Sequence, residues 1–230
     1  MTIGQRPPPS DGARGRILAR IRARQGKAAA PAAAERDAVN AHIAAHPQNA
    51  RPRVDWDPAA RFREQAERLA STVDQVETLD AVPAAVARYL RHGGLPLTAV
   101  CWDEFADLAW SGAGIDVLLR EARDADLVGV TGAFCAIAET GTLMTVSGPR
   151  TPATANLLPE THIAIVRASR VVRGMEEAWQ LLRDELKVPP RAVNFISGPS
   201  RSADIEQTVT LGAHGPYRVH IVLVRDRPAA

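Results

Sequence analysis

Residues 127–146, LVGVTGAFCAIAETGTLMTV, decide the fold class of this chain. The apolar run Leu127–Thr131 predicts a strand with turn residues directly after it. A second apolar stretch, Phe134–Ala138, leads through the turn residues 139–141 into a strand expected over Thr142–Val146. Strands joined by turns of small, hydrogen-bonding residues are typical of an α/β protein, in which the strands form the frame and the loops carry the chemistry.

Strands and helices alternate along the rest of the chain. Further strands are expected over Thr72–Val76, Leu97–Cys101, His162–Arg167, Val193–Ser197 and Tyr217–Arg225. Helices are expected over Asp11–Arg24, Ala34–Ala45, Pro58–Ser71, Ala81–His92, Met175–Lys187 and Ala203–Val209. This alternation predicts a layered α/β fold with a largely parallel central sheet.

The composition changes near Pro47 and Pro52, which predicts two parts: an N-terminal extension, residues 1–53, and an α/β domain, residues 54–230. The extension holds ten Lys and Arg against three Asp and Glu, net +7, whereas the domain holds eighteen against twenty-three, net −5. Such a basic, helical or partly disordered arm suits nucleic acid or an acidic partner. No aromatic residue precedes Trp56 to stack on bases, so nucleic acid is disfavoured.

Several classes of protein are excluded by what the sequence lacks. Its two cysteines, Cys101 and Cys135, have no metal-site spacing, and an iron–sulfur cluster takes about four, so no metal or cluster is expected on this chain. Neither GxGxxG nor a Walker motif is present, which disfavours nucleotide cofactors. No apolar run reaches the roughly 18 residues of a membrane span, and the polar start Met1–Ser10 lacks the core of a signal peptide. A cytoplasmic protein is predicted.

The segment ISGPSRSADIE, residues 196–206, is the first candidate for a binding site. It is expected to run from a strand into a helix, where free N–H groups favour an anion. Arg201 adds positive charge, whereas Asp204 and Glu206 oppose an anion unless they hold Arg201 or a substrate hydroxyl. The alternative is an ordinary capped turn. The predicted ligand-binding residues of this segment are Ser197, Gly198, Ser200, Arg201 and Asp204.

Two further turns supply candidates for catalysis. Glu139 follows an apolar stretch and is a candidate nucleophile or general base, with Thr140, Gly141 and Thr142 as ligand-binding neighbours. His214 lies in the loop GAHGP, residues 212–216, where it could transfer a proton while Gly215 lets a ligand approach the backbone. The alternatives are a solvated turn glutamate and a structural histidine. By contrast, His162 and His220 lie in strand-like runs and are predicted to be packing residues. We expect Glu139, Ser197, Ser200, Arg201, Asp204 and His214 to converge on one pocket.

Four motifs in this order, AIAETGT, LLPETHIAIV, ISGPSRSADIE and GAHGP, resemble the LUD domain family. The resemblance covers residues from about 55 to 226. It implies a Rossmann-like sheet similar to that of the NagB/RpiA/CoA-transferase superfamily. It also implies a subunit of a lactate-utilization system that supports oxidation of L-lactate to pyruvate, with iron–sulfur clusters on partner proteins. Some transferases of that superfamily use a glutamate nucleophile, for which Glu139 is the position to compare, although the local motif differs.

Two alternatives to this function stay open. One is a stand-alone transferase or isomerase that acts on a phosphosugar or an acyl-CoA, and it predicts turnover by this chain alone. The other is a non-catalytic structural or regulatory subunit, and it predicts a strong partner interface without a ligand. For the lactate-utilization subunit, the expected pocket binds a small carboxylate or a phosphorylated metabolite.

Overall fold

The computed structural model describes residues 11–28, 30–48, 50–52, 55–202 and 210–226. The chain divides into two compact units, residues 1–52 and 53–230. In the first unit lie α1 (Asp11–Arg24) and α2 (Ala33–Ala45), both expected from the sequence. The Glu35 carboxylate accepts a hydrogen bond from the Ala32 N–H at 3.1 Å, which satisfies one of the free donors at the start of α2. Among the described residues, no helix is both long and apolar enough to cross a membrane.

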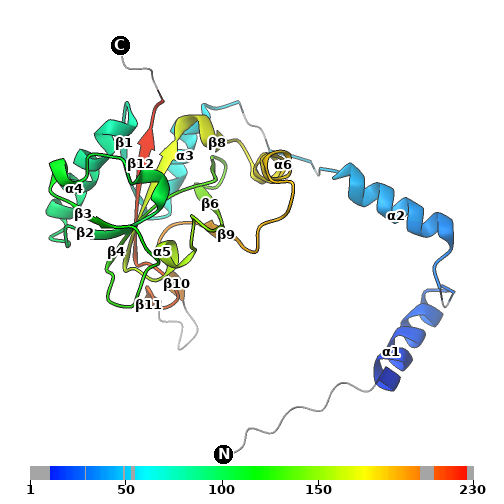
Figure 1. Ribbon diagram of the computed structural model, residues 1–230. Helices are drawn as coiled ribbons and strands as arrows, with labels where there is room; N and C mark the ends of the chain where they lie inside the picture. Colours follow the sequence, from blue (N-terminus) through cyan, green and yellow to red (C-terminus); the bar gives the residue numbers. More distant parts are fainter. Residues whose placement is uncertain (1–10, 29, 49, 53–54, 203–209, 227–230) are drawn as a thin grey trace, which may run out of the picture. The chain divides into compact units, whose positions relative to one another are not determined.

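A six-stranded parallel sheet forms the centre of the second unit (Figure 1). Its order is β1-β12-β7-β4-β2-β3, and each neighbouring pair is parallel. The strands are β1 (Thr72–Val76), β2 (Thr98–Cys101), β3 (Asp116–Leu118), β4 (Val128–Gly132), β7 (Thr161–Arg167) and β12 (Arg218–Val224). The α/β fold with a largely parallel sheet is therefore confirmed, although β3 was not predicted.

The two faces of this sheet are both covered, which explains why β7 and β12 are apolar along most of their length. On β7, Ile163 and Ile165 pack in the core formed with α4 (Val82–His92). Ala164 and Val166 alternate with them and pack in a second core with α3 (Pro58–Arg68). Figure 1 shows α4 and α3 on opposite sides of the sheet.

A second, mixed sheet adds a layer on the α3 side, in the order β8-β5-β6-β9. Its strands are β5 (Cys135–Ile137), β6 (Thr142–Val146), β8 (Val171–Val172) and β9 (Val193–Ile196). Ala136 and Leu143 face the core with α3, whereas Cys135 and Met144 pack against α6 (Met175–Glu185). This separate sheet was not predicted, because β5 and β8 are too short to give a periodic pattern.

The remaining elements are short. They are α5 (Thr154–Leu157), the antiparallel pair β10 (Arg201–Ser202) and β11 (Thr210–Leu211), and the 3-10 turns η1 (Leu79–Ala81), η2 (Asp103–Phe105), η3 (Ser111–Ala113) and η4 (Ala168–Arg170). The helix expected over residues 203–209 lies outside the described residues.

Two histidines are buried in the central sheet, as predicted. His162 on β7 shares a 2.7 Å hydrogen bond between its Nε2 and Thr131 Oγ1, and His220 on β12 shares one of 2.8 Å between its Nδ1 and Thr72 Oγ1. The Tyr89 ring stacks on His220 at a centroid distance of 3.8 Å. Burial lowers the pKa of both imidazoles to about 4, so both are neutral at neutral pH.

The order of the strands reverses within the central sheet. The chain runs from β1 at one edge to β2 and β3 at the other, and then returns through β4, β7 and β12. In such open parallel sheets, ligands bind outside the carboxyl ends of the strands near the point of reversal. The carboxyl ends of β2, β4 and β7 are therefore where the fold favours a site.

Candidate functional site

A cavity of about 500 Å³ lies at the carboxyl ends of the central strands, and we call it the carboxyl-edge cavity. Its size falls within the range of about 300–1,000 Å³ that is usual for small-molecule sites. Apolar side chains form much of its wall, and three ionisable groups line it. The lining residues are Leu79, Glu104, Phe105, Gly132, Ala133, Phe134, Ile165, Arg167 and Arg170.

Glu104 is held in place by the turn η2, which directly follows β2. The residues on either side of the Asp103–Glu104 pair, Trp102 and Phe105, are buried at 4% and 8% exposure. The Trp102 Nε1–H donates to the Pro152 carbonyl at 3.1 Å, and the Trp110 Nε1–H donates to the Phe105 carbonyl at 2.7 Å. These contacts fix the backbone of η2 and so position the exposed Glu104 side chain at the cavity.

The carboxyl group of Glu104 lies directly against the end of β4. A Cβ atom on Gly132 would lie 2.0 Å from Glu104 Oε1 and 3.3 Å from Phe105 Cε2, so glycine is what allows this approach. Within the described part of the chain, the Glu104 carboxyl group makes no hydrogen bond. Although Glu104 as a whole is exposed, its carboxyl group lies against Gly132, and the resulting desolvation raises its pKa above the usual range, while the charges of Arg167 and Arg150 lower it in part.

Arg167 is the cation of the cavity with donors to spare. It ends β7, and its Nη1–H donates to Asp226 Oδ1 at 2.9 Å, whereas its side chain is 50% exposed. Asp226 is also bound by the hydroxyl and the N–H of Ser169. Burial opposes ionisation of Asp226, but the Ser169 and Arg167 hydrogen bonds prevail and lower its pKa. Arg167 is thus oriented by a carboxylate, and among the described residues its Nε–H and its second terminal nitrogen have no partner, so they can donate to a ligand.

Arg170, in contrast, is a structural part of the wall. Its Nε–H donates to the Phe134 carbonyl at 2.8 Å, and both terminal nitrogens pair with the Glu185 carboxylate. The guanidinium also stacks over the Phe134 ring at 4.8 Å from the centroid. Because each of its three nitrogens already makes one of these hydrogen bonds, the Arg170 side chain is fixed in the wall, where it stiffens the cavity and contributes positive charge.

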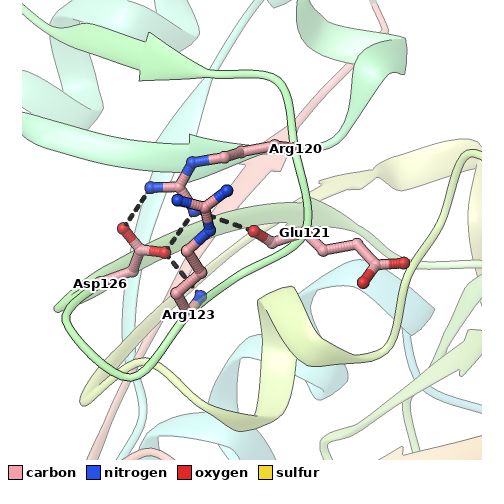
Figure 2. Close-up of polar contacts among 4 residues, drawn as sticks. All are labelled: Arg120, Glu121, Arg123 and Asp126. Carbon is pink, nitrogen blue, oxygen red and sulfur yellow. Dashed lines mark hydrogen bonds and ion pairs between the residues drawn. The ribbon is translucent and has the colours of Figure 1, made fainter.

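A smaller cavity of about 220 Å³ lies beside the first and is lined by Trp102, Asp103, Arg120 and Arg150, among others. Figure 2 shows that Arg120 is engaged within its own loop. Its guanidinium forms two hydrogen bonds to the Asp126 carboxylate, of 2.6 and 2.8 Å, and one to the Glu121 carbonyl. The Arg123 N–H also donates to Asp126, and these bonds lower the pKa of Asp126, the Arg120 hydrogen bond most. Arg120 therefore closes the loop between β3 and β4.

The residues predicted from the turn sequences form two contact groups in another part of the domain. In the first group, Thr140 Oγ1–H donates to Thr142 Oγ1, which in turn shares a hydrogen bond with Ser197 Oγ, each 2.8 Å long. Gly141 (φ 67°) and Gly198 (φ 77°) lie so close to α3 that a Cβ would meet the backbone of Gln65 and Ala66 or of Leu69. Glu139 precedes this turn and donates its N–H to the Arg173 carbonyl at 2.9 Å.

The second group joins the segment around Ser200 to the loop of His214. The Ser200 N–H donates to the Pro216 carbonyl at 2.8 Å, and the His214 N–H donates to Ser200 Oγ at 3.3 Å. A Cβ on Gly215 would lie 3.6 Å from the Ser200 Cβ. Arg201 is exposed, and its Nη2–H reaches the Leu69 carbonyl at 3.4 Å. Asp204 lies outside the described residues.

Both groups border the starts of strands. Leu69 precedes β1, and Pro216 precedes β12, so the predicted loops lie near the amino ends of these strands. None of the described predicted residues lines the carboxyl-edge cavity. Glu104, Gly132, Arg167 and Arg170, which line the cavity, were not among the residues predicted from the sequence. A signal was present, since Gly132 follows one predicted strand at once, Arg167 ends another, and Glu104 comes three residues after a third.

Comparison with known families agrees with this architecture. The LUD domain model matches residues 59–224, which include both sheets and the carboxyl-edge cavity. The chain belongs to the LUD domain family. The match begins inside α3 and ends with β12, so it leaves α1 and α2 outside the family domain.

Several curated relatives of this LUD-domain chain are described as lactate utilization protein C. "Lactate utilization protein C" from Geobacillus sp. (strain WCH70) is 32% identical over 179 residues, 68% of this chain and 71% of the relative. The protein of that description from Exiguobacterium sp. is 47% identical over 103 residues, 43% of this chain and 44% of the relative. The chain thus matches about half the length of several of these relatives.

The crystal structure of a DUF162 family protein from Deinococcus radiodurans is similar to this chain with a TM-score of 0.54 and 22% identity. The superposition covers 73% of this chain and 96% of that one. At this identity, the likeness supports the fold of the LUD domain.

Proposed function

We propose that this chain acts in lactate utilization as the component that binds a small carboxylate. The observation that carries the proposal is its similarity to proteins described as lactate utilization protein C, at 32% identity over 68% of the chain. The carboxyl-edge cavity supplies the chemistry such a role needs: an oriented guanidinium, Arg167, for the carboxylate, and an apolar wall for the carbon skeleton. The reaction it would support is oxidation of L-lactate to pyruvate.

The electrons of that oxidation would pass to partner proteins. Removal of two electrons from lactate requires an acceptor, and the sequence holds only two cysteines, fewer than the roughly four that an iron–sulfur cluster uses. Burial raises the pKa of the Cys101 thiol to about 12 and that of the Cys135 thiol to about 11, so neither side chain is readily a thiolate. Iron–sulfur clusters on partner proteins are therefore part of the proposal.

Growth on L-lactate tests this function. A strain that lacks the native gene and carries the wild-type chain should grow, whereas the same strain carrying Arg167→Ala should grow poorly. Arg225→Ala is the matched control, because Arg225 is exposed and pairs only with Glu77 at 3.3 Å among the described residues. Arg167→Ala that folds and supports full growth would refute the assignment of the cavity.

Turnover separates this proposal from the stand-alone transferase or isomerase. Purified chain should reduce no electron acceptor with lactate until its partner proteins are added. Isomerase or transferase activity of the chain alone on a phosphosugar or an acyl-CoA would contradict the proposal.

A further inference from the structure

The carboxyl-edge cavity has an acidic residue that carboxylate binding by itself does not require. A carboxylate ligand needs the guanidinium of Arg167, and an adjacent Glu104 would repel it if both were ionised. Yet the η2 turn and Gly132 together place the Glu104 carboxyl group at the cavity. Its function must therefore concern another part of the ligand.

Within the described residues, no hydrogen bond engages the Glu104 carboxyl group, so both of its oxygens can still bond a ligand. Arg170 and Arg167 carry only N–H donors; within the described residues Arg170 donates to Phe134 and Glu185, and Arg167 donates to Asp226, so neither bonds Glu104. Leu79, Phe105 and Ile165 can offer a ligand only apolar contact through their side chains. Glu104 is therefore the one side chain lining the cavity that can accept a hydrogen bond from a ligand group.

We propose that Glu104 is a specificity-determining residue, whose carboxyl group hydrogen-bonds the oxygen on carbon 2 of a small carboxylate held by Arg167. The cavity then prefers 2-hydroxy acids to the same acids without the hydroxyl. This inference rests on the proposed binding of a carboxylate at Arg167. A hydroxyl group both donates and accepts, so it can pair with Glu104 whether the glutamate is ionised or protonated.

The expected size of this preference follows from hydrogen-bond energetics. A hydrogen bond to a charged group contributes about 1.5–3 kcal/mol, which corresponds to roughly 10- to 140-fold in affinity. Propionate has the carbon skeleton of lactate without the hydroxyl, so it should bind more weakly than L-lactate by about this factor.

Calorimetric titration of the full-length chain with L-lactate and with propionate tests the inference. In the wild type, L-lactate should bind at least about tenfold more tightly. Glu104→Ala should bring L-lactate down to the affinity of propionate and leave propionate no weaker. Glu104→Gln should keep most of the preference, because its amide still hydrogen-bonds a hydroxyl. Arg167→Ala should weaken both ligands.

Asp103→Asn serves as the matched control, since Asp103 is the neighbouring carboxylate in η2 and does not line the cavity. Its ligand preference should equal that of the wild type, and thermal melting should show that all variants are folded. Equal binding of both ligands by the wild type, or an unchanged preference in Glu104→Ala, would overturn the inference while carboxylate binding stands. Binding of neither ligand by the wild type would overturn the proposed function itself.

Discussion

Single residues decide how close two segments can come at the carboxyl ends of the strands. Gly129 and Gly132 lie on the same strand, β4, but different atoms lie next to their Cα atoms. A Cβ on Gly132 would meet the flexible end of Glu104, whereas a Cβ on Gly129 would lie 2.0 Å from the Ala155 backbone oxygen and 3.0 Å from Pro159 Cγ. Gly132 therefore serves the cavity, and Gly129 serves the packing of α5 on the sheet.

These two glycines give a matched pair of variants. Gly132→Ala should displace the Glu104 side chain and lose the preference for L-lactate over propionate, with a small effect on melting temperature. Gly129→Ala should lower the free energy of unfolding by about 1–3 kcal/mol, because the Ala155 backbone carbonyl cannot move aside as a side chain does. Thermal melting with ligand titration checks both. Equal destabilisation by the two changes would contradict this distinction.

The protonation of Glu104 gives a prediction on pH. The charged groups around it are Arg150 and Arg167, with Arg170 across the cavity, Asp103 beside it in η2 and Asp226 beyond Arg167. A 2-oxo acid such as pyruvate can accept a hydrogen bond only from protonated Glu104, so its affinity should fall as pH rises through the raised pKa of this residue. L-Lactate should respond less. Glu104→Gln should make pyruvate binding independent of pH over this range, and a persistent decline would point to another group.

The buried His162 links stability to pH. Its pKa is about 4 in the folded chain and about 6.5 when unfolded, so the unfolded state takes up a proton first as pH falls. Its neutral form thus supports stability above pH 6.5, and that support is lost between pH 6.5 and 4. His162→Leu should reduce the slope of unfolding free energy over this window by up to about 1.4 kcal/mol per pH unit. Denaturant unfolding at several pH values measures this slope. An unchanged slope in His162→Leu would contradict the conclusion that His162 is neutral in the folded chain.

His214 and Arg201 stay predicted functional residues. Both are exposed, so alanine at either position should change the unfolding free energy by less than about 1 kcal/mol. If they act on a ligand, growth on L-lactate should fall far more than stability. Thermal melting of each variant is compared with growth on L-lactate of a strain that carries it. Normal melting with full growth would show that these loops are not the site. Loss of folding would show that the two residues stabilise the structure.

At the scale of elements, long apolar runs were predictable and short ones were not. The sequence patterns located β1, β6, β7 and β12 to within about a residue. For β7 and β12 the reason is that both faces of these central strands are buried, which leaves a long apolar run in the sequence. The three residues of β5 and the two of β8 leave no such pattern, and they pair only through a second sheet that long-range contacts create. The cavity was missed for the same reason: Glu104, Gly132 and Arg167 are 28 and 35 residues apart in sequence and meet only once strands are ordered.

The start of α3 gives a prediction at this scale. Asp57 Oδ1 accepts the Ala60 N–H at 2.7 Å and so caps the helix ahead of Pro58. Asp57→Ala should lower the unfolding free energy by about 1 kcal/mol. The control Asp55→Ala, also exposed and two residues earlier, should have little effect. A similar loss in both variants would show that the effect is one of general charge rather than of the cap.

In the molecule as a whole, we expect ligand binding at the carboxyl ends of the parallel strands rather than at the turn sequences of residues 139–142, 197–201 and 212–215. Amide chemical-shift mapping by NMR during titration with L-lactate compares the two regions directly. We expect chemical-shift changes at Glu104, Gly132–Phe134 and Arg167–Arg170. Shifts confined to residues 139–142, 197–201 and 212–215, or no shifts at millimolar L-lactate, would contradict this expectation.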